Sequence, residues 1–207
     1  MIDLESEFSR YFREINSALD DFELYKGILS NVDGNEKKIN QINGFLYTIL
    51  NSLRYSFVMK TAKLVDKRED KNIFKFLNCC KNQQNQFLKN FVDEFYNEVT
   101  KTTEKIFIKK VNVLDDIKNF ELELDKYSTQ IENIKAQRDM IYAHNDKKYF
   151  YDNGKVSEEF KVTYNDIDEI LHLIFKKLNI LSIDYNRRVY SKFSDTLDDY
   201  LHIIEKL

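Results

Sequence analysis

The chain has 207 residues and a formal net charge of −3, from 32 basic and 35 acidic side chains, so no overall positive field would attract nucleic acid. Proline is absent and glycine occurs only four times, which excludes most turn-rich β-sandwich and β-barrel folds. The length is sufficient to bury a core without disulfides or metal ions. We therefore expect an all-α protein in which residues 1–207 form a single helical bundle.

The start of the chain and its apolar stretches indicate neither export nor membrane insertion. Residues 1–7 are acidic and amphipathic, unlike the basic and then apolar start of a signal peptide. The apolar stretches at 45–59 and 170–183 are short and interrupted by polar residues, which favours core helices over membrane spans. Cys79 and Cys80 are adjacent and make a poor disulfide, and no histidine lies nearby at metal-ligand spacing. We expect a cytoplasmic protein with reduced thiols and with no metal or cofactor.

Two long amphipathic helices are predicted in the first third of the chain. From Leu4 to Leu29, apolar residues recur at intervals of three and four, as along one face of a helix. A second helix is predicted from about Ile39 to Val65, followed by a break at 66–70, and it is apolar enough to be central. The apolar positions are Phe8, Tyr11, Phe12, Ile15, Leu19, Phe22 and Tyr25 in the first helix, and Phe45, Leu46, Ile49, Leu50, Leu53, Phe57 and Val58 in the second.

Three further helical segments are predicted in the middle of the chain. A short helix is expected at 73–80 and a longer one at 87–108. The third begins near Asp115 and Asp116, acidic residues that favour a helix N-terminus, and its apolar stripe continues to Ile141. The apolar positions of the 87–108 segment are Phe91, Phe95, Val99 and Phe107.

After a stop at 145–148, the last part of the chain predicts one further core helix. Residues 148–162 suit a loop or a small hairpin, the only β element expected. Thr163 is expected to cap the core helix, and Ser194 to start a closing helix to Leu207. The core face of the capped helix is predicted to comprise Ile167, Ile170, Leu171, Ile174, Leu178 and Leu181.

The residues at the end of the 115–141 helical pattern are candidates for catalysis. Arg138 occupies a position on the apolar stripe, where a cation is expected to line a cleft or to cover a partner surface, because burying it alone is costly. His144 follows after a gap of residues 139–143. Arginine binds phosphate through a planar fork of donors and histidine exchanges protons near neutral pH, so the pair suits phosphodiester chemistry without a metal.

This segment resembles the signature of the HEPN superfamily, an arginine followed by a polar residue, with a histidine closing a gap of four to six residues. Arg138, Asp139 and His144 match it. Residues 64–67, Leu-Val-Asp-Lys, followed by the apolar segment 73–77, also resemble the Leu-x-Asp stretch and short helix of the AbiU-like abortive-infection branch. The resemblance therefore rests on two segments that lie far apart in the sequence.

The resemblance implies a helical domain that forms a homodimer with two motifs facing one cleft, and a metal-independent endoribonuclease that acts in phage defence or as a toxin, with an antitoxin as a further partner. His144 would transfer protons, Arg138 would stabilise the transition-state charge on phosphate, and Asp139 would orient either residue. Asn145 and Asp146 would support the imidazole. Some HEPN toxins carry a modified tyrosine two residues after the histidine, but Asp146 stands there.

Basic and aromatic residues near the motif are candidates for RNA binding, although a solvated helix face is the commoner role for such residues. In a second interpretation, Arg138 pairs with an acidic neighbour and His144 merely ends a helix. The alternative function is a non-catalytic helical module that binds RNA, a nucleotide or a partner protein. The candidate RNA-binding residues are Lys63, Lys67, Arg68, Lys147, Lys148 and Tyr149.

Overall fold

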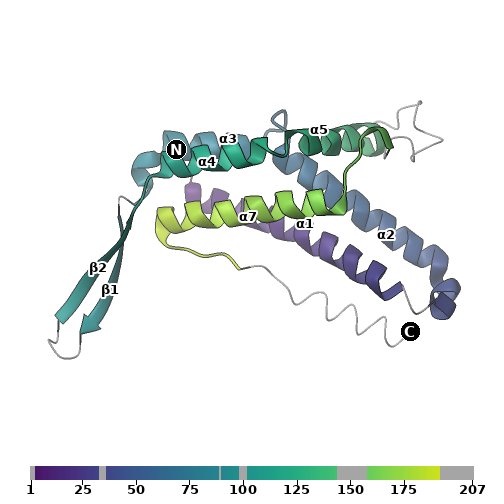
Figure 1. The fold of residues 1–207 in the computed structure, drawn as a ribbon, viewed down its shortest axis with the longest axis horizontal. Helices are drawn as coiled ribbons and strands as arrows, with labels where there is room; N and C mark the ends of the chain where they lie inside the picture. Colours follow the sequence, from purple (N-terminus) through teal and green to yellow (C-terminus); the bar gives the residue numbers. More distant parts are fainter. Residues whose placement is uncertain (1–2, 33–35, 89, 98–101, 144–157, 192–207) are drawn as a thin grey trace.

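The computed structural model describes residues 3–32, 36–88, 90–97, 102–143 and 158–191, with the backbone alone for 31–32, 36–43, 90–97, 102–110 and 141–143. Three long helices and three shorter ones pack side by side, and one hairpin extends from an end of the body (Figure 1). The long helices are α1 (Leu4–Val32), α2 (Glu36–Val65) and α7 (Tyr164–Asn186). The predicted all-α class is confirmed for the body of the protein.

Helices α1 and α7 supply most of the core, and both behave as their sequences predict. Every predicted apolar position of α1 from Phe8 to Tyr25 is buried, as is every predicted core position of α7. Thr163 caps α7 in a reciprocal box with Asp166, since its hydroxyl accepts from the Asp166 backbone N–H and its own N–H donates to the Asp166 carboxylate. The core residues from all these helices form one continuous cluster.

Among the described side chains of helix α2, those near its C-terminal end are the buried ones. Phe57 and Val58 are buried, and the Phe57 ring makes an edge contact with Phe22 of α1. Phe45 and Tyr47, in contrast, are 63% and 68% exposed, so the predicted central position is wrong for this part of the helix. A periodic apolar stripe predicts which residues share a helix face, but not how far a neighbouring helix extends along it.

The segment at 87–108 is not helical. It forms an antiparallel hairpin of β1 (Asn90–Asn97) and β2 (Thr102–Lys110), with Asn90 opposite Lys110 and a bulge between Phe91 and Val92. Aromatic spacing of four suits a helix, but the threonines, isoleucines and phenylalanines of this segment favour a pleated strand, and that preference prevails. The hairpin predicted at 148–162 lies mostly outside the described residues.

The predicted helix from 115 to 141 is three elements. Helix α4 (Val113–Asp125) carries Asp115 and Asp116 in its first turn, as expected, and a turn at 126–127 separates it from α5 (Ser128–Gln137). The chain then continues as a π-helical turn, η2 (Arg138–Ala143). The short helix α3 (Ile73–Asn82) and a 3-10 turn, η1 (Gln84–Gln86), precede the hairpin.

Two further predictions concern membranes and thiols. No helix in the described part of the chain is long and apolar enough to span a membrane. Cys79 is half-buried and Cys80 is buried, and both are free thiols, as expected. Burial raises the pKa of the Cys80 thiol above its ordinary value, so this side chain behaves as a packed apolar group and not as a nucleophile.

Candidate functional site

The loop between α2 and α3, residues 66–72, is held by buried Asn72. Its amide nitrogen donates to the carbonyls of Lys67 and Glu69, at 3.3 and 2.6 Å, and its side-chain oxygen caps α3 by accepting from the Lys75 backbone N–H at 3.0 Å. The Tyr11 hydroxyl, from the core of α1, donates to the Asn72 carbonyl at 2.7 Å. The loop is therefore fixed to three helices, and it holds its first residue, Asp66, in one place.

Arg138 begins the π-helical turn that follows α5. Its backbone N–H still donates to the carbonyls of Ile134 and Lys135, so the change from α to π geometry occurs at this residue. Single π turns inside helices are rare and occur frequently at functional sites. The motif arginine therefore stands where this helix changes from α to π geometry.

The guanidinium of Arg138 is surrounded by three carboxylates. Its Nη2 donates to Asp66 at 2.7 Å, its Nη1 to Glu69 at 3.0 Å and its Nε to Asp139 at 2.7 Å. Each of its nitrogens thus has an acidic partner, and two of the three partners come from the loop between α2 and α3. The two segments that carry the family resemblance meet at this arginine.

Arg68 completes a closed arrangement of two arginines and two aspartates, which we call the arginine–aspartate ring (Asp66, Arg68, Arg138 and Asp139). Arg68 Nε donates to both oxygens of Asp66, at 3.1 and 3.0 Å, and its Nη2 donates to Asp139 at 2.8 Å. Each aspartate thereby bridges both arginines. Lys135 Nζ lies 3.7 Å from Asp66 and also pairs with Glu132.

Burial and charge act in opposite directions in the ring. Burial alone would raise the pKa of Asp66, but hydrogen bonds from Arg68 and Arg138 hold that pKa well below its ordinary value. The same two arginines outweigh burial at Asp139 and lower its pKa as well. The pKa of Arg138 is raised, because hydrogen bonds to Asp66 and Asp139 outweigh its burial. All four ring residues are therefore charged at neutral pH.

The position of Arg138 differs from the predicted open cleft. In the described part of the chain, its side chain is only 9% exposed. Burial is tolerated because the charge is not alone: Asp66, Glu69 and Asp139 neutralise it through hydrogen bonds. The interpretation in which Arg138 pairs with acidic neighbours describes this geometry.

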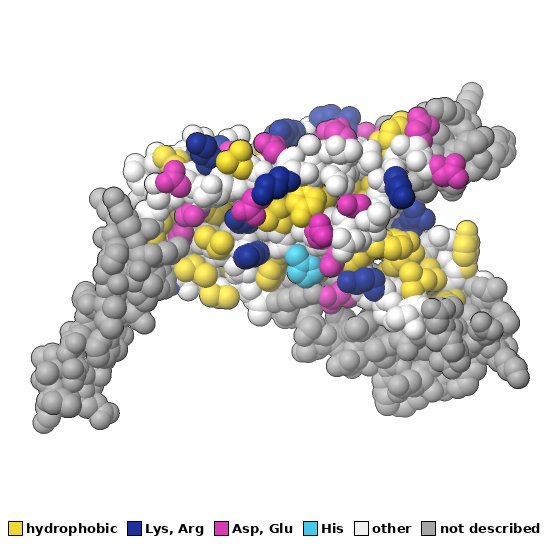
Figure 2. Space-filling model, in the orientation of Figure 1, with side chains coloured by type: hydrophobic (Ala, Val, Ile, Leu, Met, Phe, Trp, Pro, Cys, Tyr) yellow, Lys and Arg dark blue, Asp and Glu magenta, His cyan; other side chains and the backbone are white. Residues whose placement is uncertain are grey.

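Most of the predicted residues beyond the ring lie outside the described part of the chain: His144, Asn145, Asp146, Lys147, Lys148 and Tyr149. Of the predicted RNA-binding residues that are described, Lys63 is exposed and Lys67 lies 4.5 Å from the centre of the Phe74 ring, a cation–π contact. Figure 2 shows basic and acidic side chains interspersed over the described surface of one face of the molecule.

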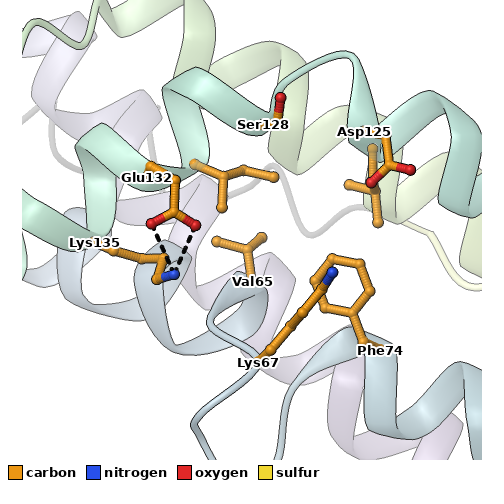
Figure 3. A pocket seen from close by; sticks show the side chains of 9 residues that line it. Val65, Lys67, Phe74, Asp125, Ser128, Glu132 and Lys135 are labelled. Carbon is orange, nitrogen blue, oxygen red and sulfur yellow. Dashed lines mark hydrogen bonds and ion pairs between the residues drawn. The ribbon is translucent and has the colours of Figure 1, made fainter.

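Figure 3 shows a pocket of about 90 Å³ whose lining includes Val65 and Lys67, the two neighbours of Asp66 in the chain. Lys67 and Phe74 line one side of it, and Glu132 and Lys135 of α5 the other, with the two α5 side chains hydrogen-bonded to each other at 2.8 and 3.0 Å. Lys135 belongs to both features, because it lines the pocket and lies close to Asp66. The remaining lining residues are Leu124, Asp125, Ser128 and Ile131.

Two members of the charged cluster were not predicted from the sequence. Lys135 precedes Arg138 by about one helical turn, so a helical wheel of the motif helix would have placed it nearby. No sequence pattern places Glu69 near Arg138, because their contact depends on the path of the loop that Asn72 holds.

The model of the HEPN family AbiU2 matches residues 1–204 of the chain. No curated protein matches the chain, and no solved structure does. The matched range contains every described residue, including the loop at 66–72 and the turn at 138–143.

Proposed function

Because the chain belongs to the AbiU2 family of HEPN proteins, we propose that it is a metal-independent endoribonuclease that acts in abortive infection or as a toxin in the cytoplasm. The observation that supports this proposal is the Asp66–Arg138 contact at 2.7 Å, which joins the two segments that resemble the family's motifs. Clusters of charged groups with shifted pKa values, such as the one around the motif arginine, are common at functional sites.

In the proposed reaction, the ribose 2′-oxygen attacks the neighbouring phosphorus and the 5′-oxygen of the next nucleotide leaves. The 2′-hydroxyl loses its proton and the leaving oxygen gains one, so the products are a 2′,3′-cyclic phosphate and a 5′-hydroxyl. His144 is proposed to transfer protons, with Asn145 and Asp146 supporting its imidazole. Arg138 is proposed to stabilise the charge that develops on the phosphate, and Asp139 to orient Arg138.

The proposal includes a homodimer in which two motifs face one cleft, as the family resemblance implies. Sedimentation velocity at micromolar concentration tests this point, and a monomer at all concentrations would contradict it. An antitoxin or another inhibitor would be a separate chain. Its identity follows from co-purification and not from the residues described above.

A second candidate is a non-catalytic module that binds RNA, a nucleotide or a partner protein. One observation favours it: three of the five N–H donors of Arg138 already bind carboxylates, and the side chain is only 9% exposed, so a phosphate has little access to the two that remain. The two candidates differ in a simple respect. The enzyme needs His144 for turnover, whereas the binding module cleaves nothing.

The test is cleavage of total RNA and tRNA in EDTA by the purified wild type and by the His144→Ala variant. His172→Ala is the matched control, because His172 is exposed on α7 and its ring nitrogen already contacts the Asp168 carbonyl. We expect cleavage by the wild type and the control, with cyclic phosphate ends identified by mass spectrometry, and none by His144→Ala. Equal cleavage by all three would indicate a contaminating nuclease, and an inactive wild type would favour the binding module.

A further inference from the structure

We propose that Arg68, and not Arg138, provides the first contact with an RNA phosphate at this site. The proposal rests on the proposed RNA site but not on cleavage, and it concerns the two arginines of the arginine–aspartate ring. Both bind the same two aspartates, yet they differ in exposure: the Arg68 side chain is 63% exposed and that of Arg138 is 9% exposed.

The hydrogen bonds leave an unused and exposed nitrogen on one arginine only. An arginine side chain carries five N–H donors on three nitrogens. Arg138 uses all three nitrogens for carboxylates. Arg68 uses Nε and Nη2, and no residue in the described part of the chain accepts a hydrogen bond from its Nη1. A phosphate can therefore bind Arg68 without first displacing an aspartate.

The free energy needed to release each arginine from the ring also favours Arg68 as the first phosphate contact. Removing a partner from a buried ion pair leaves an uncompensated charge in a poorly solvated site, which is strongly unfavourable. An exposed ion pair is screened by water and contributes little, so exchanging one of its carboxylates for a phosphate costs little. Arg138 is in the first situation. Arg68 is in the second at its pair with Asp139, where the two side chains are 63% and 32% exposed.

The ring also orients Arg68. Asp66 and Asp139 hold two of its nitrogens, at 3.0–3.1 and 2.8 Å, so the plane of the guanidinium is set before any ligand arrives. Planar, bidentate recognition of phosphate depends on such an orientation. Because Asp139 directly follows Arg138 in the motif, a phosphate on Arg68 lies beside the proposed catalytic segment. During this first contact Arg138 holds Asp66 and Asp139 in place, and its proposed role in the cleavage step comes later.

The test measures binding of a 2′-O-methyl RNA oligonucleotide, which cannot be cleaved by 2′-oxygen attack, by fluorescence anisotropy over a series of salt concentrations. For Arg68→Ala, we expect binding about tenfold weaker and a salt slope, log K against log salt, that is smaller by about 0.7, the value for one contact with single-stranded phosphate. Arg68→Lys should keep the slope and lose part of the affinity, because it keeps the charge but not the fork.

Arg188→Ala is the matched control, since Arg188 is also an exposed arginine in an ion pair, with Glu5 at 2.9 Å, and it follows the end of α7. It should bind as the wild type does. Arg68→Gln serves as the second variant if Arg68→Ala does not fold. An unchanged slope in the folded Arg68 variant would overturn the proposal, as would a wild type that does not bind this RNA. A wild type that binds through Arg68 but cleaves no RNA would support the proposal and contradict the endoribonuclease.

Discussion

Asp66 and Arg138 lie 72 positions apart in the sequence, and their side chains meet at 2.7 Å with the carboxylate fully buried. The contact joins the residue that directly follows α2 to the residue that begins the π turn after α5. Because each side chain neutralises the other in a poorly solvated place, neither can be lost without leaving a buried charge. The pair therefore belongs to the stability of the fold as much as to the proposed site.

The first prediction concerns the stability that Arg138 provides. Arg138→Ala should lower the free energy of unfolding by about 3 kcal/mol, because Asp66 is left buried without its closest cation. Urea denaturation followed by circular dichroism measures this loss. Arg188→Ala, which removes an exposed ion pair with Glu5, should cost less than about 1 kcal/mol.

A double variant separates the pair from the rest of the cluster. Asp66→Ala combined with Arg138→Ala should lose clearly less stability than the sum of the two single losses, because the second substitution removes a charge that the first left unpaired. Simple additivity would show that the two side chains do not interact in solution.

The sequence predicts the residues of this site better than it predicts their contacts. Arg138 and Asp139 follow from a local motif, and Asp66 belongs to a second segment that resembles the same family. Their meeting, and the contact of Glu69 with Arg138, depend on the loop that Asn72 and Tyr11 hold in place. Such contacts arise from packing between distant elements, which no local pattern encodes.

In the fold, a single apolar face along a helix predicts the buried residues correctly, whereas a segment with both helix and strand signals is predicted wrongly. Helices α1 and α7 have one apolar face each, and the predicted buried residues are the observed ones. The 87–108 segment has aromatic residues at a spacing that suits a helix and residue types that favour strands, and it forms a hairpin. In α2, the exposed Phe45 and Tyr47 are as apolar as the buried Phe57 and Val58, because exposure depends on the neighbouring elements and not on the helix itself.

The second prediction concerns acid stability. The pKa of Asp66 is lower in the folded protein than its ordinary value of about 4, so the unfolded chain binds the proton more readily. The stability that this carboxylate provides is therefore complete above about pH 4, and it is lost as the pH falls towards the lower folded pKa. Between pH 6 and pH 3, the wild type should lose about 1 kcal/mol more unfolding free energy than Asp66→Asn, which has no proton to gain.

The control for this experiment is Asp125→Asn, which removes an exposed carboxylate at the end of α4. Its loss of stability between pH 6 and pH 3 should match that of the wild type. An equally steep loss in Asp66→Asn would mean that other carboxylates account for the acid sensitivity and that the ring contributes little.

The third prediction concerns the hairpin. Asn90 and Lys110 are paired at its base, Leu88 is held by a hydrogen bond to the Asp184 carbonyl at 2.8 Å, and Val111 is buried. The body on both sides of the hairpin is therefore anchored independently of it, and an isolated two-stranded hairpin adds little stability of its own. Replacing residues 90–110 with a short Gly-Ser linker should change the free energy of unfolding by no more than about 1 kcal/mol.

Phe57→Ala, in the core between α1 and α2, should cost about 3–5 kcal/mol in the same assay. A loss of that size on removal of the hairpin would show that β1 and β2 are covered in solution, and its dependence on protein concentration would distinguish a second copy of the chain from the body of the same one.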